Sequence, residues 1–117
     1  ESILDDMGAL PPGKGYDDKF YVGFFENDSL VGLMDLILDY PEKEISFIGL
    51  FMTDTRYQNR GVGSQIISDM IPCLKSYGYQ EIQLGVDKGN PQSYSFWTKN
   101  KFTPIREDTY ILMGLRI

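Results

Sequence analysis

Residues 56–64, with the sequence RYQNRGVGS, have the composition of a turn that binds phosphate groups. Glycine has no Cβ atom, so Gly61 and Gly63 allow backbone N–H groups to approach a ligand closely. An amphipathic stretch follows, and a helix that starts there adds unpaired N–H donors and a partial positive charge of about half a unit. The segment therefore predicts an anion site suited to a diphosphate.

Other phosphate-binding turns do not match this segment. A nucleotide P-loop requires Lys and then Ser or Thr after its second glycine, whereas a Ser-Gln pair follows here, and a dinucleotide fingerprint requires a third glycine where Ile66 stands. A kinase loop would belong to a much longer chain. The spacing Q-x-x-G-x-G of Gln58, Gly61 and Gly63, between an apolar run and a helical pattern, remains.

The residues that are missing exclude several kinds of chemistry. The chain of 117 residues has no histidine, which removes the most common metal ligand and the most common general base. A Ser-His-Asp or Cys-His mechanism within this chain is therefore excluded. Cys73 is the single cysteine, so the chain forms no intrachain disulfide.

The bulk composition predicts one globular domain. Hydrophobic residues make up 42% of the chain, which is enough for a core, and the length suits a single domain over residues 1–117. A net charge of −6 argues against a nucleic-acid partner and is compatible with a cationic partner such as an amine. With no long apolar run and no signal peptide, the chain is expected to be cytoplasmic, without a membrane partner.

The elements that must position the glycine turn follow from the hydrophobic pattern, which predicts the order β-β-β-α-β-α-β-β. Three strands between residues 20 and 53 form an antiparallel meander with a polar turn at Asn27 and Asp28. A helix begins near Gly61 and ends at Gly78, and a short strand follows at residues 81–86. A second helix has Asn90 as its N-cap, and two strands close the chain.

Two motifs in this order resemble the GNAT superfamily of N-acetyltransferases. Gln58, Gly61 and Gly63 match the family's Q/R-x-x-G-x-G/A signature. Downstream, residues 90–102 (NPQSYSFWTKNKF) resemble its N-x-x-A-x-x-F-Y/W-x-x-x-G-F helix. The resemblance covers residues 47–102, about half of the chain, and the flanking strands fit the fold more loosely.

The resemblance implies an α/β fold, called α+β in some schemes. A mixed, mostly antiparallel central sheet has flanking helices and a pair of parallel strands that splay apart, and the thioester lies in the gap. The family's usual first strand and helix pair are not found here. Either upstream sequence is missing or the domain is trimmed, and in the second case a partner subunit, as in a homodimer, is expected to cover the edge.

The resemblance also implies acetyl-CoA as the cosubstrate, with no metal. The end of the third strand, at Phe51, Met52 and Thr53, is expected to offer backbone groups to the pantetheine arm. Asn90 is expected to meet the pantetheine or to cap the second helix. The diphosphate is expected at the backbone amides of Gln58, Asn59, Arg60, Gly61, Val62, Gly63 and Ser64.

The proton-transfer residues depart from the family's pattern. Trp97 stands where relatives usually carry the tyrosine that protonates the leaving thiolate, so Tyr94, one turn earlier, is the candidate acid. Relatives often carry a glutamate base at the strand positions of Phe47 and Gly85, and neither residue can act as a base. Tyr110 is a further candidate for proton transfer.

Asp35 is the candidate general base, because it interrupts the apolar run LMDLIL. An acid in such a run either points to solvent or lies in a cleft. Asp54 and Asp87 are the alternatives, and each also suits a turn or an exposed position.

The function predicted on these grounds is acetyl-CoA-dependent N-acetyl transfer to a primary amine of a small molecule or peptide, by direct attack, an acyltransferase activity of the EC 2.3.1 type. The alternative is a catalytically silent CoA-binding sensor or interaction module on the same fold. A third interpretation is a transferase for another acyl group or for an oxygen acceptor.

Overall fold

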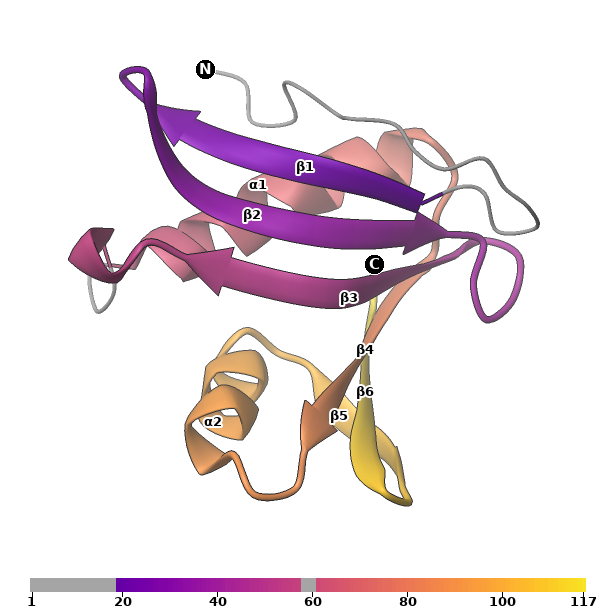
Figure 1. The fold of residues 1–117 in the computed structure, drawn as a ribbon. Helices are drawn as coiled ribbons and strands as arrows, with labels where there is room; N and C mark the ends of the chain where they lie inside the picture. Colours follow the sequence, from indigo (N-terminus) through magenta and orange to yellow (C-terminus); the bar gives the residue numbers. More distant parts are fainter. Residues whose placement is uncertain (1–18, 58–60) are drawn as a thin grey trace.

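The computed structural model describes residues 19–57 and 61–117. Within this part of the chain, six strands and two α-helices follow in the order that the hydrophobic pattern predicts (Figure 1). The elements are β1 (Lys19–Glu26), β2 (Ser29–Leu38), β3 (Ile45–Thr53), a 3-10 turn (Thr55–Tyr57), α1 (Val62–Ser76), β4 (Glu81–Asp87), α2 (Pro91–Lys99), β5 (Thr103–Glu107) and β6 (Tyr110–Arg116).

Strands β1, β2 and β3 form the antiparallel meander that the sequence predicts. The β1–β2 turn lies at Asn27 and Asp28, whose φ angles of 51° and 71° suit a tight hairpin between twisted strands. Side chains alternate between two faces: Val22, Phe24 and Met34 are buried on one face, and the opposite face is largely exposed.

The sheet is split between β3 and β4. These strands are parallel and pair over only four positions, from Ile45–Glu81 to Ile48–Leu84, although both strands continue beyond them. The register between β2 and β3 shifts at this point, so that Gly49 is an extra, bulged residue on β3. Beyond Ile48 the two strands diverge, as Figure 1 shows, and the splayed parallel pair is therefore confirmed.

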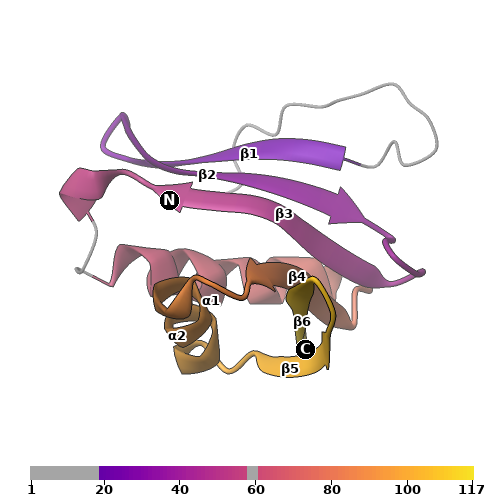
Figure 2. The same ribbon diagram turned by 60° about the horizontal axis from the view of Figure 1, so that its bottom comes forward.

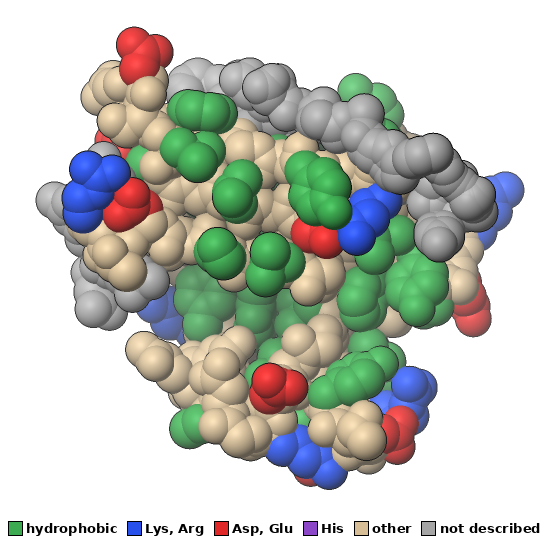
Figure 3. All heavy atoms as spheres, in the orientation of Figure 1, with side chains coloured by type: hydrophobic (Ala, Val, Ile, Leu, Met, Phe, Trp, Pro, Cys, Tyr) green, Lys and Arg blue, Asp and Glu red, His purple; other side chains and the backbone are tan. Residues whose placement is uncertain are grey.

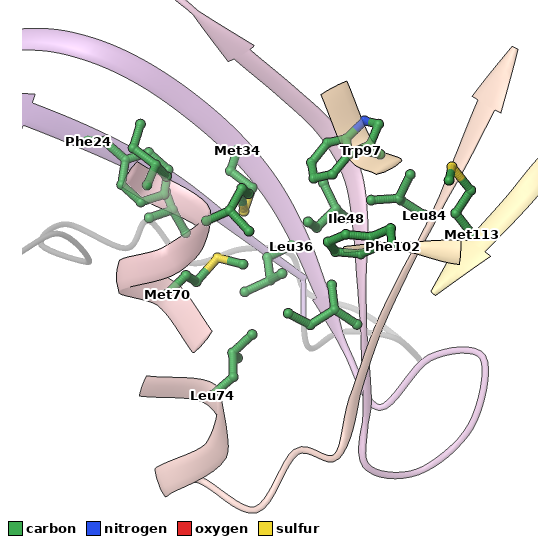
Figure 4. Packing of buried hydrophobic residues seen from close by; sticks show 14 of the residues in the cluster. Phe24, Met34, Leu36, Ile48, Met70, Leu74, Leu84, Trp97, Phe102 and Met113 are labelled. Atoms are coloured by element: carbon green, nitrogen blue, oxygen red, sulfur yellow. The ribbon is translucent and has the colours of Figure 1, made fainter. Parts of the chain in front are cut away.

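Helix α1 connects β3 to β4 and lies along the buried face of the meander (Figure 2). It buries Ile66, Ile67, Met70 and Leu74, the apolar side of the predicted helix. Gly78, with a φ of 93°, follows its last turn and donates a hydrogen bond to the Lys75 carbonyl. Figure 4 shows the core continuing from Phe24 beside α1 towards Trp97 and Phe102.

The second half of the sheet carries α2. Strand β4 pairs with β6 and β6 with β5, both antiparallel, which gives the strand order β1-β2-β3-β4-β6-β5. Asn90 caps α2 as predicted, since its side-chain oxygen accepts a hydrogen bond from the Ser93 N–H at 3.0 Å. In the described part of the chain, neither helix has the length and apolar character needed to cross a membrane.

Candidate active site

A cleft of about 600 Å³ lies between the end of β3, the start of α1 and one side of α2. A volume of this size is typical of sites for small molecules and cofactors. In Figure 3 the surface is hollowed between the meander and the part formed by α2, β4 and β6. The cleft is lined by Phe51, Met52, Thr53, Gly61, Val62, Gly63, Ser64, Asn90, Gln92, Ser93, Phe96, Trp97 and Lys99.

The start of α1 forms the polar end of the cleft. Gly61 is its N-cap residue and has a left-handed φ of 77°, which glycine adopts without a steric penalty. No side chain among the described residues caps this helix, and its first turn contains no acidic residue. The first N–H groups of the helix thus have no partner within the helix, and their dipole favours an anion in the cleft.

The second wall is the end of β3. Phe51 and Met52 pair with β2 on one side, and on the other side β4 has already diverged at Ile48. Backbone groups on the side facing the split have lost the partner strand that a continuous sheet would supply. A ligand with amide groups can satisfy them in the manner of a short extra strand.

The third wall is an aromatic cluster on α2. The ring of Phe96 lies 4.8 Å from that of Trp97 and 6.1 Å from that of Phe51, measured between centroids. Trp97 is 6% exposed and also packs against Phe102, with centroids 5.1 Å apart. Trp97 therefore serves the packing of α2 against the core.

Most of the residues predicted to hold the cofactor come together in this cleft. Those in the described part of the chain all line it, and Gln58, Asn59 and Arg60 lie outside the described residues. The sequence interpretation missed Gln92, Ser93 and Lys99, together with the rings of α2. Their spacing of three and four residues from Asn90 onward identifies one side of a helix and could have revealed them.

The structure does not bring the two predicted catalytic residues together in the cleft. Tyr94 is absent from the cleft lining and packs half-buried against the core, so its role as proton donor stays a prediction. Asp35 lies on the exposed face of the meander, with Oδ2 3.2 Å from Lys19 Nζ and with its side chain 14% exposed. Its Oδ1 atom is buried and has no hydrogen-bond partner among the described residues.

The alternative acids have different surroundings. Asp54 accepts hydrogen bonds from the guanidinium and the backbone N–H of Arg56, and these lower the pKa of its carboxyl from the ordinary 3.8 to about 2. Asp87 is exposed at the end of β4. Among the described residues, no group of three His, Cys, Asp or Glu side chains could hold a metal ion.

Comparison with solved structures reproduces the fold. A PaiA N-acetyltransferase from Thermoplasma acidophilum in complex with coenzyme A superposes with a TM-score of 0.76 at 21% identity, covering 86% of this chain and 62% of that one. An acetyltransferase from Thermus thermophilus superposes with a TM-score of 0.78 at 22% identity, covering 86% of this chain and 65% of that one. A Bacillus subtilis acetyltransferase in complex with CoA superposes with a TM-score of 0.70 at 18% identity, covering 86% of this chain and 78% of that one.

This chain thus spans less than two thirds of the length of the first two structures. No curated protein sequence matches it. The model of the acetyltransferase (GNAT) family matches residues 5–102, which is most of the chain and includes both motifs. Together with the split sheet and the cleft at the start of α1, this match shows that the chain belongs to the GNAT acetyltransferase family.

Proposed function

We propose that this protein transfers the acetyl group of acetyl-CoA to a primary amine by direct attack of the amine nitrogen. The observation that carries the proposal is the continuity of the cleft. It runs from the N-terminus of α1 to the end of β3 at Phe51, Met52 and Thr53, beyond the last β3–β4 pair at Ile48. This path offers an anion site and then the backbone groups at the end of β3, the strand that leads back to the split.

The residues present suit acetyl-CoA. The first turn of α1, with Gln58, Asn59 and Arg60 before it, would hold the diphosphate. The edge of β3 at residues 51–53, together with Asn90, would hold the pantetheine arm. When bound, acetyl-CoA would supply a thioester, whose acetyl group passes to the amine while the CoA thiolate leaves.

Asp35 is the general base in this proposal. An alkyl amine with a pKa near 10.4 is about 0.04% neutral at pH 7, so deprotonating its ammonium form at this pH costs about 4.6 kcal/mol of free energy. A Cβ atom added at Gly49, one residue beyond the last β3–β4 pair, would lie 3.4 Å from Asp35 Oδ2, so the carboxylate lies beside the split. There it can attract the ammonium and, directly or through water, take the proton that the nitrogen loses as the C–N bond forms and the C–S bond breaks.

Direct attack is supported by the residues of the cleft. An acetyl-enzyme requires an activated nucleophile, usually a cysteine or serine with an adjacent base. The chain has no histidine, and Cys73 does not belong to the cleft lining. Ser64 and Ser93 line the cleft, but neither has a base as a hydrogen-bond partner in the described part of the chain.

The test combines binding with turnover. CoA is titrated into the protein while its melting temperature is followed, and acetyl-CoA is then incubated with a panel of amines and a thiol reagent. We expect CoA to raise the melting temperature and at least one amine to release thiol and gain an acetyl group. No stabilisation by CoA would refute the proposed cofactor site.

The silent CoA-binding module is the second candidate function. It is favoured by Trp97, which stands at the position of the family's usual tyrosine and is enclosed in an aromatic cluster. Stabilisation by CoA without thiol release from any amine would support this candidate and refute the transferase.

A further inference from the structure

The face of the meander opposite α1 is apolar and exposed. Figure 3 shows hydrophobic side chains gathered over β1, β2 and β3, with an acidic and a basic group among them. The large apolar side chains on this face are 39–53% exposed: Tyr21, Phe25, Leu30, Leu33, Leu50 and Met52. Exposed apolar clusters of this kind usually mark a surface that binds a ligand, another protein or a membrane.

Asp35 is the acidic side chain of this face. It is the only acid in the sequences of β2 and β3. Only one of its two oxygens is satisfied, because Oδ2 meets Lys19 and the buried Oδ1 has no partner in the described part of the chain. A carboxylate placed in this way can accept further N–H donors.

Two glycines leave room for the side chains of other residues at the split, one on each strand. Gly49 on β3 and Gly85 on β4 directly follow the last residue pair, Ile48–Leu84. A Cβ atom at residue 49 would lie 3.4 Å from Asp35 Oδ2, and a Cβ atom at residue 85 would lie 3.0 Å from the ring of Tyr110. A carboxylate and an aromatic ring therefore occupy the space beside the two backbones where the strands begin to diverge.

Lys19 already shows how this face holds an alkylammonium group. Its Nζ atom lies 3.2 Å from Asp35 and 5.4 Å from the centroid of the Tyr21 ring. A carboxylate combined with an aromatic face attracts ammonium groups by charge and by cation–π interaction. The hydrogen bond to Asp35 raises the pKa of Lys19 above its ordinary 10.5, which keeps Lys19 protonated and makes it a counter-ion rather than a nucleophile.

We propose that this face is the acceptor site and that it selects a primary amine with one positive charge and an apolar, aromatic body. The ammonium takes the place of Lys19 on Asp35, and the body lies against Tyr110, Tyr21 and Leu50. A second positive charge, as in a polyamine, would rest on apolar side chains, because Asp35 is the only acid that β2 and β3 contribute. The inference rests on the proposed transferase activity, since it names the substrate class of the same site.

The experiment measures amine binding without turnover. The protein is saturated with CoA, and 2-phenylethylamine, butylamine and spermidine are titrated in separate calorimetric runs at one ionic strength. We expect 2-phenylethylamine to bind about tenfold more tightly than either of the others. Asp35→Asn should weaken its binding about tenfold or more, because a hydrogen bond to a charged partner is lost.

Lys19→Met gives the sharper result. Removing the competing ammonium should strengthen the binding of 2-phenylethylamine severalfold, whereas loss of a merely structural ion pair would weaken it or leave it unchanged. Lys75→Met, on α1 and therefore on the opposite side of the meander, is the matched control and should have no effect. Gly85→Val should displace the Tyr110 ring and weaken amine binding while the thermal shift caused by CoA is retained.

The outcomes separate this inference from the proposed function. Equal or tighter binding of spermidine, or no response to Lys19→Met, overturns the acceptor site even if acetyl transfer to some amine is observed. A dimer that buries this face at the working concentration also overturns it. Absence of any acetyl transfer, with the expected binding order intact, refutes the transferase and leaves the amine site in place.

Discussion

Gly61 holds the left-handed backbone from which α1 starts, and its missing side chain faces open space at the polar end of the cleft. We expect Gly61→Val to weaken CoA binding about tenfold or more, because the new side chain enters the space where the diphosphate would meet the helix N-terminus. Isothermal titration calorimetry with CoA measures the effect.

Gly78 offers a closely matched control. It too has a left-handed φ, of 93°, and a Cβ atom added there would also meet open space, but it lies beyond the other end of α1. Gly78→Val should cost a similar amount of stability through backbone strain, about 1–3 kcal/mol, and leave CoA affinity unchanged. Equal affinities for the two variants would show that the diphosphate does not bind at Gly61.

Asp54 makes a prediction about pH. Its pKa of about 2 lies below the ordinary 3.8, so its interaction with Arg56 contributes stability that is complete above pH 3.8 and is lost as the pH falls through about 2. An NMR titration of the carboxyl carbon should give this midpoint. Arg56→Gln should move the midpoint up towards 3.8 without reaching it, because the backbone N–H of residue 56 still donates.

The control for this titration is Arg106→Gln, which removes the ion pair with Asp108 on the β5–β6 turn. It should leave the midpoint of Asp54 where it was. A midpoint near 3.8 in the unaltered protein would show that the Asp54–Arg56 contact does not persist in solution.

The sequence predicted single residues well where local chemistry decides their position. The capping role of Asn90 and the helix stop at Gly78 depend on contacts within a few residues, and both are found. The ion pair between Asp35 and Lys19, and the position of the Tyr110 ring beside Gly85, depend on the register of neighbouring strands. Hydrophobic alternation alone does not fix that register, so these contacts were not foreseen.

Helix α2 carries one wall of the cleft, and its start depends on one hydrogen bond. Asn90→Ala removes the acceptor for the Ser93 N–H, so we expect a loss of about 1 kcal/mol in the free energy of unfolding, measured in urea. CoA affinity should also fall, since the wall that contains Phe96 is less firmly held.

Asn90→Ser keeps a capping oxygen and serves as the control for α2. This variant should retain most of the free energy of unfolding. Its CoA affinity shows whether the asparagine side chain itself contributes to CoA binding. If Asn90→Ala unfolds at the same urea concentration as the unaltered protein, the cap does not stabilise the helix.

At the scale of elements, the order of strands and helices followed from periodicity, and the parallel β3–β4 pair followed from the family resemblance. The length of that pair did not. The pair ends where Gly49 is bulged against β2, and this bulge depends on pairing between residues that hydrophobic alternation does not fix. The lining of the cleft by Lys99 depends on how α2 packs against the core, where Trp97 contacts Phe102.

For the molecule as a whole, the walls of the cleft come from segments on either side of the undescribed residues 58–60. CoA should bridge them, so we expect slower hydrogen exchange both at residues 51–53 and in the first turn of α1 at residues 62–64. The amides of the β1–β2 turn at Asn27 and Asp28 lie away from the cleft lining and serve as the internal reference. Protection confined to one wall would contradict the bridging arrangement.

The four residue pairs between β3 and β4 also have a mechanical consequence. Five residues of β3 extend beyond the last pair to Thr53, and at about 3.3 Å per residue they form an arm of about 16 Å. This arm is paired with β2, so the two strands would have to turn together. A turn of about 10° would change the width of the cleft at its far end by about 3 Å, with almost no movement at the four β3–β4 pairs. The angle between the two halves of the sheet therefore sets how wide a ligand the cleft can hold.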